Sequence, residues 1–233
     1  ADKVHLSPTA CGERLARLFD LSDTVALDAA NVASRDGYFG ADGKAAERLR
    51  AELEKLRQSQ RDAIEASVTA ERIGTRNGLP APEAGPSPAE PPDFEPYRRF
   101  YQSKQRQMAA VVPPLRLKAR GALTDHGPAL ARLARIDAVL DNTLTGYARK
   151  GFGAVPGVLE KRFLALWPDR QHSLLSDTPG DDPQDWMKEG AWLHRFCQEM
   201  KTLLLAELDT RLEPVQGLLM ALESAHNDPQ GPQ

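Results

Sequence analysis

The C-terminal part of the chain contains the feature that most limits its fold, an apolar stripe between residues 190 and 224. At about 1.5 Å per residue, a helix over this stretch is roughly 50 Å long. A single helix of that length cannot bury its own apolar face, so the rest of the chain must supply helices that cover it. The stripe repeats in steps of three or four residues, the period of an α-helix: Trp192, Phe196, Met200, Leu204, Leu208, Leu212, Val215, Leu219 and Leu222.

A second stretch of matching length and period covers residues 128–167. Pro128 is suited to the first helical position, and Trp167-Pro168 is expected to end the helix. The glycines near position 151 each weaken a helix by about 1 kcal/mol relative to alanine, so we expect either one kinked helix or two shorter ones. Because one loop joins the two stretches, we predict an antiparallel hairpin of 128–167 with 190–224. The stripe of the first stretch is Leu130, Leu133, Ile136, Leu140, Leu144, Tyr147, Val155, Leu159, Phe163 and Leu166.

A third helix is predicted over residues 94–123, with Asp93 or Phe94 near its N-terminal cap. The pair Pro113-Pro114 removes two backbone donors from the middle of this helix, which predicts a kink. Helix-forming residues such as Ala, Leu, Arg, Glu and Gln are abundant, and the strand formers Val, Ile and Thr are scarce. We therefore predict an all-α fold, an elongated helical bundle built on the hairpin and this third helix.

The domain organisation follows from where the helical pattern stops. Residues 1–73 form N-terminal helices, the last of them a charged helix with the narrow apolar seam of a bundle edge or a coiled coil. Residues 74–93 contain six prolines and few apolar side chains, which is typical of an extended linker. The bundle core covers 94–225, and the tail 226–233 is expected to be disordered.

The charges are divided unevenly along the chain. Residues 94–167 have 13 basic and 5 acidic side chains, whereas residues 168–233 have 5 basic and 12 acidic side chains. This asymmetry indicates segments that pack on each other or on a partner. The candidate interaction surface is Tyr97, Arg98, Arg99, Arg106, Arg116, Lys118 and Arg120, and the candidate complementary acidic face is Glu199, Glu207, Asp209 and Glu213.

Signals of catalysis are scarce in the sequence. A glycine-rich phosphate loop, a Walker-type lysine and a nucleophile elbow are all missing, and the five histidines are scattered. The single Glu223-x-x-His226 has no second copy, which argues against a helical-bundle metalloenzyme. Cys11 and Cys197 fit buried reduced thiols better than a disulfide framework. No apolar run approaches the ~20 residues of a membrane span, and no signal-peptide pattern opens the chain, so we expect a cytoplasmic protein without a cofactor and without membrane insertion.

Several segments resemble an uncharacterised, all-helical proteobacterial family known as domain of unknown function 3348. The strongest similarity starts at Phe196-Cys197-x-x-Met200 and continues through Leu204-Leu205-Ala206-Glu207-Leu208-Asp209-x-Arg211-Leu212-x-Pro214-Val215-x-Gly217-Leu218-Leu219. Further similar segments are Asp93-Phe94-x-Pro96-Tyr97-Arg98-Arg99-x-Tyr101, Pro128-Ala129-Leu130-Ala131-x-Leu133-Ala134 and Leu159-Glu160-Lys161-Arg162-Phe163, so the similarity covers roughly 93–223. Gly151 and Gly153 depart from the family pattern.

The resemblance implies no catalytic residue, because the family has no assigned activity. It does imply an accessory role beside a MotA/ExbB-like membrane protein and an OmpA-like peptidoglycan-binding protein, which is an association and not a mechanism. Our functional hypothesis is a non-enzymatic interaction or scaffold protein that binds another helical protein or a second copy of itself. The alternative is nucleic-acid binding by the basic face of residues 94–120, where aromatic side chains are interleaved with the cations.

Overall fold

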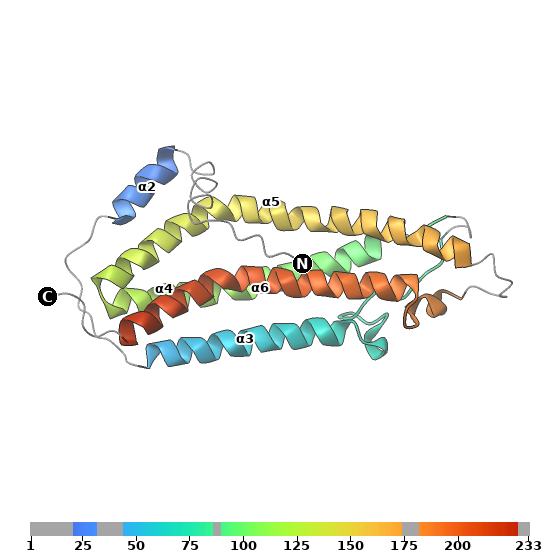
Figure 1. Ribbon diagram of the computed structural model, residues 1–233, viewed down its shortest axis with the longest axis horizontal. Coiled ribbons are helices and arrows are strands. Elements are labelled where there is room, and N and C mark those ends of the chain that lie inside the picture. The colour runs from blue at the N-terminus through green and yellow to red at the C-terminus, as the bar shows by residue number, and fades with distance from the viewer. Residues whose placement is uncertain (1–20, 32–43, 86–89, 174–181, 228–233) are drawn as a thin grey trace. The chain divides into compact units, whose positions relative to one another are not determined.

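The computed structural model describes residues 21–31, 44–85, 90–173 and 182–227, and within these ranges it contains five α-helices and no β-strand (Figure 1). The predicted all-α fold is therefore confirmed. Residues 1–20, which include Cys11, and residues 228–233 of the predicted tail lie outside the described residues. The helices are α2 (Leu21–Asn31), α3 (Ala45–Ser67), α4 (Glu95–His126), α5 (Pro128–Ser173) and α6 (Trp192–Asn227), with the 3₁₀ helices η1 (Ala70–Arg72) and η2 (Pro183–Met187).

The helix α6 agrees closely with the predicted apolar stripe. All nine of its predicted stripe residues are buried, with exposed fractions between 0% and 8%. Pro214 lies inside α6 and has no N–H to donate to the carbonyl of Thr210, yet the helix continues past it to Asn227. No neighbouring atom lies within 4 Å of a Cβ built at Gly217, so this glycine marks no close approach of another backbone among the described residues.

The helix α5 is a single helix of 46 residues, which settles the choice between one helix and two. It continues through Gly151 and Gly153 and ends at Ser173 instead of at Trp167-Pro168. A proline removes only its own donor and disfavours the turn before it, so a single Pro168 does not prevent the helix from continuing. Tyr147, which was expected in the buried stripe, is 47% exposed. In the N-terminal half of α5, the buried positions are Ala131, Ala134 and Asp137.

The helix α4 begins with the predicted cap. The Asp93 side chain accepts a hydrogen bond from the backbone N–H of Glu95 at 2.9 Å, which satisfies one of the free donors of the first turn. Both Pro113 and Pro114 lie inside α4, which runs on to His126. One residue, Gly127, then separates α4 from α5.

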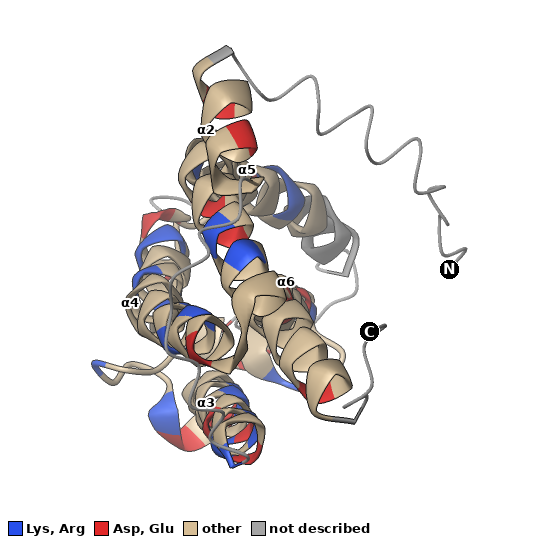
Figure 2. Cartoon of the chain, turned by 90° about the vertical axis from the view of Figure 1, so that its left-hand side faces the viewer, with Lys and Arg blue, Asp and Glu red and all other residues tan. Residues whose placement is uncertain are grey.

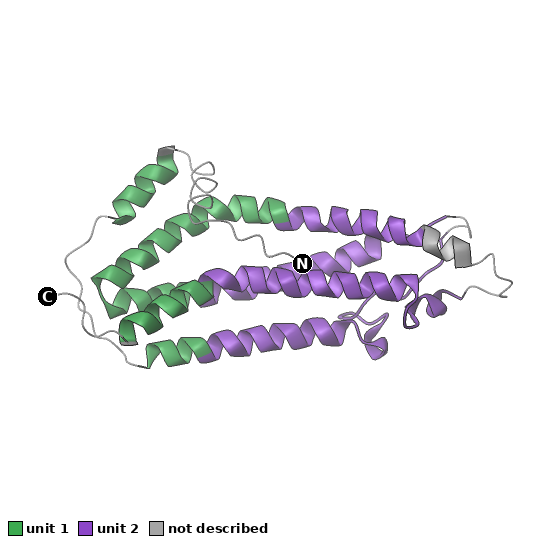
Figure 3. Cartoon of the chain, in the orientation of Figure 1, with its two compact units in different colours: residues 1–50, 116–151, 215–233 green, residues 51–115, 152–214 purple. Residues whose placement is uncertain are grey.

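The chain forms two compact units, and the four helices α3 to α6 each contribute a segment to both (Figure 3). Unit 1 contains residues 1–50, 116–151 and 215–233. In it α2 lies antiparallel to α5, since Asp23 contacts Thr143 and Asn31 contacts Arg132. The ion pair between Arg50 and Glu223 joins the start of α3 to the end of α6. The core of unit 1 contains Ala30, Leu49, Ala119, Leu123, Ala131, Ala134, Val215, Leu218, Leu219 and Leu222.

Unit 2 contains residues 51–115 and 152–214, and a cluster of aromatic rings fills one end of its core. Phe163 of α5 lies 5.1 Å from Phe196 and 5.2 Å from Trp192 of α6 between ring centroids. Arg162, which precedes Phe163 on α5, contacts Glu199, which follows Phe196 on α6. A step towards the N-terminus of α5 therefore corresponds to a step towards the C-terminus of α6. The two helices are therefore antiparallel in unit 2, as the hairpin prediction requires. The cluster consists of Phe94, Tyr97, Phe163, Trp167, Trp186, Trp192 and Phe196.

Residues 74–85 of the proline-rich segment are anchored to the core of unit 2. Leu79 is completely buried, and its backbone N–H donates to the carbonyl of Ser67 at 2.9 Å. Its carbonyl accepts a hydrogen bond from Gly74 at 2.7 Å, which closes a loop after α3. One buried leucine and two backbone bonds thus hold this loop on the end of α3.

Candidate interaction surfaces

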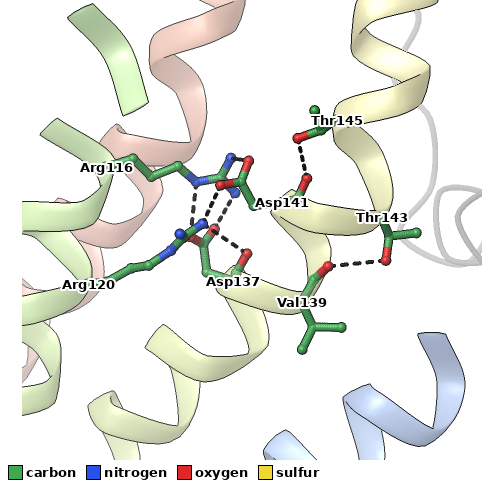
Figure 4. A network of polar contacts seen from close by, with 7 residues as sticks. All are labelled: Arg116, Arg120, Asp137, Val139, Asp141, Thr143 and Thr145. Carbon is green, nitrogen blue, oxygen red and sulfur yellow. Dashed lines mark hydrogen bonds and ion pairs between the residues drawn. The ribbon is translucent and has the colours of Figure 1, made fainter. Parts of the chain in front are cut away.

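The most extensive polar cluster in unit 1 joins two arginines of α4 to two aspartates of α5 (Figure 4). Arg116 donates to Asp137 at 2.6 and 3.0 Å and to Asp141 at 2.6 Å. Arg120 donates to Asp137 at 2.6 Å and to Asp141 at 2.7 Å. Each aspartate therefore receives hydrogen bonds from both guanidinium groups. Short, charge-assisted contacts of this kind are the strong members of the hydrogen-bond class.

This four-residue cluster is largely removed from solvent. The exposed fractions of the side chains are 16% for Arg116, 17% for Arg120, 11% for Asp137 and 33% for Asp141. The formal charges sum to zero, and a buried charge is tolerated only when it is paired in this way. The cluster therefore joins α4 to α5 and leaves neither arginine available for a ligand.

Tyr97 and Arg98, the first two residues of the candidate interaction surface, also contact other parts of the chain. Tyr97 is 4% exposed and packs its ring between Phe163 and Phe196, so it belongs to the core. Burial raises the pKa of its hydroxyl, with a smaller effect from Cys197. Arg98 pairs with Glu160 of α5 at 2.7 Å and with Glu95 at 3.0 Å.

The remaining candidates lie on the surface. Arg99 is 74% exposed and pairs with Glu95 one turn away at 3.1 Å. Arg106 and Lys118 are both exposed. Of the seven residues named from the sequence, these three are exposed, whereas the other four are buried or partly buried.

The four residues of the predicted acidic face all lie on α6, but they contact different helices or solvent. Glu199 receives a bidentate contact from Arg162 of α5 at 2.6 and 2.7 Å, and Asp209 pairs with Arg61 of α3 at 2.6 Å. Hydrogen bonding by Arg162 lowers the pKa of Glu199. Glu213 is exposed. Glu199 and Asp209 therefore stabilise contacts between helices, whereas Glu213 is exposed to solvent.

Glu207 is a buried carboxylate in the core of unit 2, with 4% exposure. It accepts hydrogen bonds from the Tyr101 hydroxyl at 3.0 Å, from Gln105 at 2.9 Å and from Arg211 at 2.6 and 2.9 Å. Burial, followed by the charge of Glu207, raises the pKa of Tyr101. With four donors and one counter-ion, the carboxylate is satisfied, which is the arrangement of a structural buried charge.

The partners of the basic residues differ from those expected. The sequence matched the basic helix to the acidic last helix, but Arg98, Arg116 and Arg120 pair with carboxylates of α5. Basic and acidic positions occur together on α3, α4, α5 and α6 (Figure 2).

The sequence did contain a local signal for the four-residue cluster of arginines and aspartates. Asp137 and Asp141 are four residues apart, as are Arg116 and Arg120, so each pair occupies one helix face.

Unit 2 also exposes an apolar face that the sequence analysis did not identify. Six residues of α5 between 153 and 165 lie within less than half of the helix circumference, and all are exposed. Val158 is 61% exposed and Leu164 is 45% exposed. Lys161 is the only charged member. We call this the α5 face, and it consists of Gly153, Ala154, Val158, Lys161, Leu164 and Ala165.

The glycines of α5 contribute to the accessibility of this face. A Cβ built at Gly153 or Gly157 meets no atom within 4 Å. These two residues are four apart and so lie one above the other on the helix. Small residues at this spacing allow a second helix backbone to approach closely. The off-stripe apolar residues Ala154, Val158 and Leu164 could have revealed the face in the sequence.

Two other kinds of chemistry, thiol reactivity and metal binding, have little support among the described residues. Cys197 is 1% exposed, and burial raises the pKa of its thiol to about 12, which keeps it protonated and unreactive at neutral pH. Among the residues that the structure describes, no group of three or more His, Cys, Asp or Glu side chains is placed to hold a metal ion.

Comparisons with known proteins identify a family but no activity. Within the described ranges, none of the helices combines the length and apolar character needed to cross a membrane. No curated protein and no solved structure matches the chain. The model of one family, described as "Protein of unknown function (DUF3348)", matches residues 1–224 and so includes the N-terminal helices as well as the segments that carried the resemblance. The chain therefore belongs to the DUF3348 family.

Proposed function

We propose that this protein is a non-enzymatic interaction or scaffold protein that binds another helical protein, or a second copy of itself, through the α5 face. The observation behind the proposal is the exposure of Val158 and Leu164 on a helix face with a single charge. Contiguous exposed apolar residues are characteristic of protein-binding sites, whereas single ones are normal on any surface.

The geometry of the α5 face suits a helix better than an extended peptide. Gly153 and Gly157 leave a shallow strip along α5, and Val158 and Leu164 lie beside it. A partner helix with apolar residues in steps of three or four would fill this strip and cover both side chains. Lys161 at the edge would then select an acidic residue on the partner.

The paired arginines make nucleic-acid binding the weaker alternative. A nucleic-acid surface gains its affinity from cations that exchange counter-ions for phosphates. Arg98, Arg116 and Arg120 already face carboxylates, so each would have to break an internal ion pair before it could bind a phosphate. This cost favours a protein partner.

The family resemblance suggests which proteins to test first. It implies an association with a MotA/ExbB-like membrane protein and an OmpA-like peptidoglycan-binding protein, and we include both as candidate partners within the proposal. Either could present a helix to the α5 face.

The experiment compares two charge-introducing variants of the full chain. Val158→Lys combined with Leu164→Lys places two cations on the α5 face. Met220→Lys, the control, places one cation at an exposed position of α6 (66% exposed). Light scattering coupled to gel filtration measures self-association, and affinity purification measures capture of the candidate partners. We expect the double variant to lose self-association or capture while the Met220 variant retains it.

Circular dichroism and urea unfolding provide the folding control, since exposed substitutions should change the free energy of unfolding by less than about 0.5 kcal/mol each. The proposal fails if the wild-type chain is monomeric and captures neither candidate. It also fails if the double variant behaves like the wild type in both assays.

A further inference from the structure

A pocket of about 260 Å³ lies between the loop after η1 and one face of α4, wholly within unit 2. The loop contributes residues 75–78 and 80, and α4 contributes residues of one helix face between Pro96 and Gln107. No acidic side chain lines the pocket. Its lining side chains include three cations, Arg76, Arg99 and Lys104, and four neutral polar groups, Thr75, Asn77, Ser103 and Gln107.

Lys104 is the unexplained residue of this pocket. It is 6% exposed, and it has no carboxylate partner among the described residues. Its ammonium group makes one long hydrogen bond, 3.5 Å to the carbonyl of Asn77, and lies 5.4 Å from the centre of the Phe100 ring. A buried ammonium normally requires a counter-ion, because its desolvation costs far more than one weak hydrogen bond returns.

The neighbouring charges increase this deficit of negative charge. Burial, followed by the positive charge of Arg72, lowers the pKa of Lys104. Arg76 is exposed and makes no ion pair with the rest of the described chain. Within the described ranges, Arg99 pairs with Glu95 alone, a carboxylate that it shares with Arg98. Exposed pairs of this kind are weak, so the Arg99 guanidinium is free to turn towards a stronger anion.

The loop after η1, which forms the pocket wall opposite α4, has a fixed shape. Gly78 admits no side chain, because a Cβ there would lie 1.7 Å from the carbonyl oxygen of Arg72. Gly74 has a φ of +77°, a conformation that other residues rarely adopt. Leu79 anchors the loop in the core. The position of Asn77 relative to Lys104 is therefore built into the fold and does not depend on a ligand.

We propose that this pocket binds a phosphate group carried by a small molecule, with Lys104 as the buried cation and Arg76 and Arg99 closing over the phosphate oxygens. Phosphate suits three converging cations better than a carboxylate does, because it has more acceptor oxygens and more charge. Arg is well matched to phosphate geometry, and Lys contributes a point charge. The hydroxyl and amide groups of the lining supply further donors.

The test titrates the full chain into inorganic phosphate and follows the ³¹P linewidth, at an ionic strength held constant with sodium chloride. Acetate, followed by ¹³C linewidth at the same ionic strength, provides the carboxylate arm. We expect saturable phosphate binding that is tighter than acetate binding. Lys104→Met should weaken phosphate binding about tenfold or more, since it removes a charge-assisted hydrogen bond. Arg76→Gln combined with Arg99→Gln should also weaken it.

Arg106→Gln is the matched control, because Arg106 lies on the same helix, is exposed and does not line the pocket. It should leave phosphate affinity unchanged. In phosphate-free buffer, Lys104→Met should be at least as stable as the wild type, whereas a lysine with a purely structural role would lose stability on substitution. The proposal is overturned if phosphate binds no better than chloride or acetate. It is also overturned if the Arg76/Arg99 double variant and the Arg106 variant bind phosphate with equal affinity.

Discussion

The four-residue cluster of unit 1 gives the sharpest prediction about stability. Asp137→Asn keeps the size of the side chain but removes one of the two negative charges that balance Arg116 and Arg120. It also turns an amide N–H₂ towards guanidinium donors that made three contacts of 2.6 to 3.0 Å. The variant therefore retains two cations with one anion in a largely buried site.

The magnitude follows from the burial of these side chains. Breaking a fully buried ion pair by removing one partner costs about 3–5 kcal/mol. Here the arginines are 16% and 17% exposed and Asp141 is 33% exposed, so water screens part of the uncompensated charge. We therefore expect a loss of about 2–3 kcal/mol in the free energy of unfolding, equivalent to about 5–10 °C in Tm.

Urea unfolding monitored by circular dichroism at 222 nm measures this loss. Asp125→Asn is the matched control, because it makes the same chemical change at an exposed position of α4. It should change the free energy of unfolding by less than about 0.5 kcal/mol. The double variant Asp137→Asn with Arg120→Gln should recover part of the loss, since it returns the site to zero net charge. A single-variant loss no larger than that of the Asp125 variant would refute the reasoning.

Three further predictions concern unit 2. Tyr101→Phe removes the hydroxyl that donates to Glu207 at 3.0 Å, and should lower the free energy of unfolding by about 1 kcal/mol in urea titration. Cys197, with its thiol pKa raised to about 12 by burial, should not react with a thiol reagent at pH 8 in the native protein and should react after unfolding, as peptide mass mapping would show. The pKa of Glu199 is lowered in the folded chain by hydrogen bonding from Arg162, so its contribution to stability is present above the ordinary pKa of 4.5 and is lost as the pH falls through the lowered value. The difference in stability between wild type and Glu199→Gln should therefore shrink on acidification.

Each of these predictions has its own contrary result. For Tyr101→Phe it is unchanged stability. For Cys197 it is labelling at the same rate before and after unfolding. For Glu199 it is a stability difference that stays constant from pH 7 to pH 3, for which Glu213→Gln, an exposed position on the same helix, is the control.

Local pattern predicted most features of the long helices. The period of α6 identified all nine of its buried stripe residues, because a regular helix transmits sequence spacing directly into a spatial face. The cap at Asp93 was also readable, since capping depends on a few neighbouring residues. The end of α5 was misplaced because a proline disfavours a helix without forbidding one.

Contacts between helices were not readable in the same way. Arg116 and Arg120 were visible as cations, but their carboxylate partners on α5 depend on which faces of α4 and α5 meet. Tyr97 likewise looked suited to a surface beside arginines, yet its ring is enclosed by Phe163 and Phe196. A helical wheel gives the angle between residues on one helix and contains no information about the rotation of the next helix.

The sequence by itself determined the helical class of this protein, the positions of its long helices and its place in a family, because these properties depend on spacing and composition along the chain. Only the tertiary structure decided which charges are paired, which apolar face stays exposed and which lysine lacks a counter-ion. The physical reason is that burial and electrostatic compensation are properties of neighbours in space. Lys104 and Asn77 are 27 residues apart in the chain and acquire a shared environment only when the loop folds against α4.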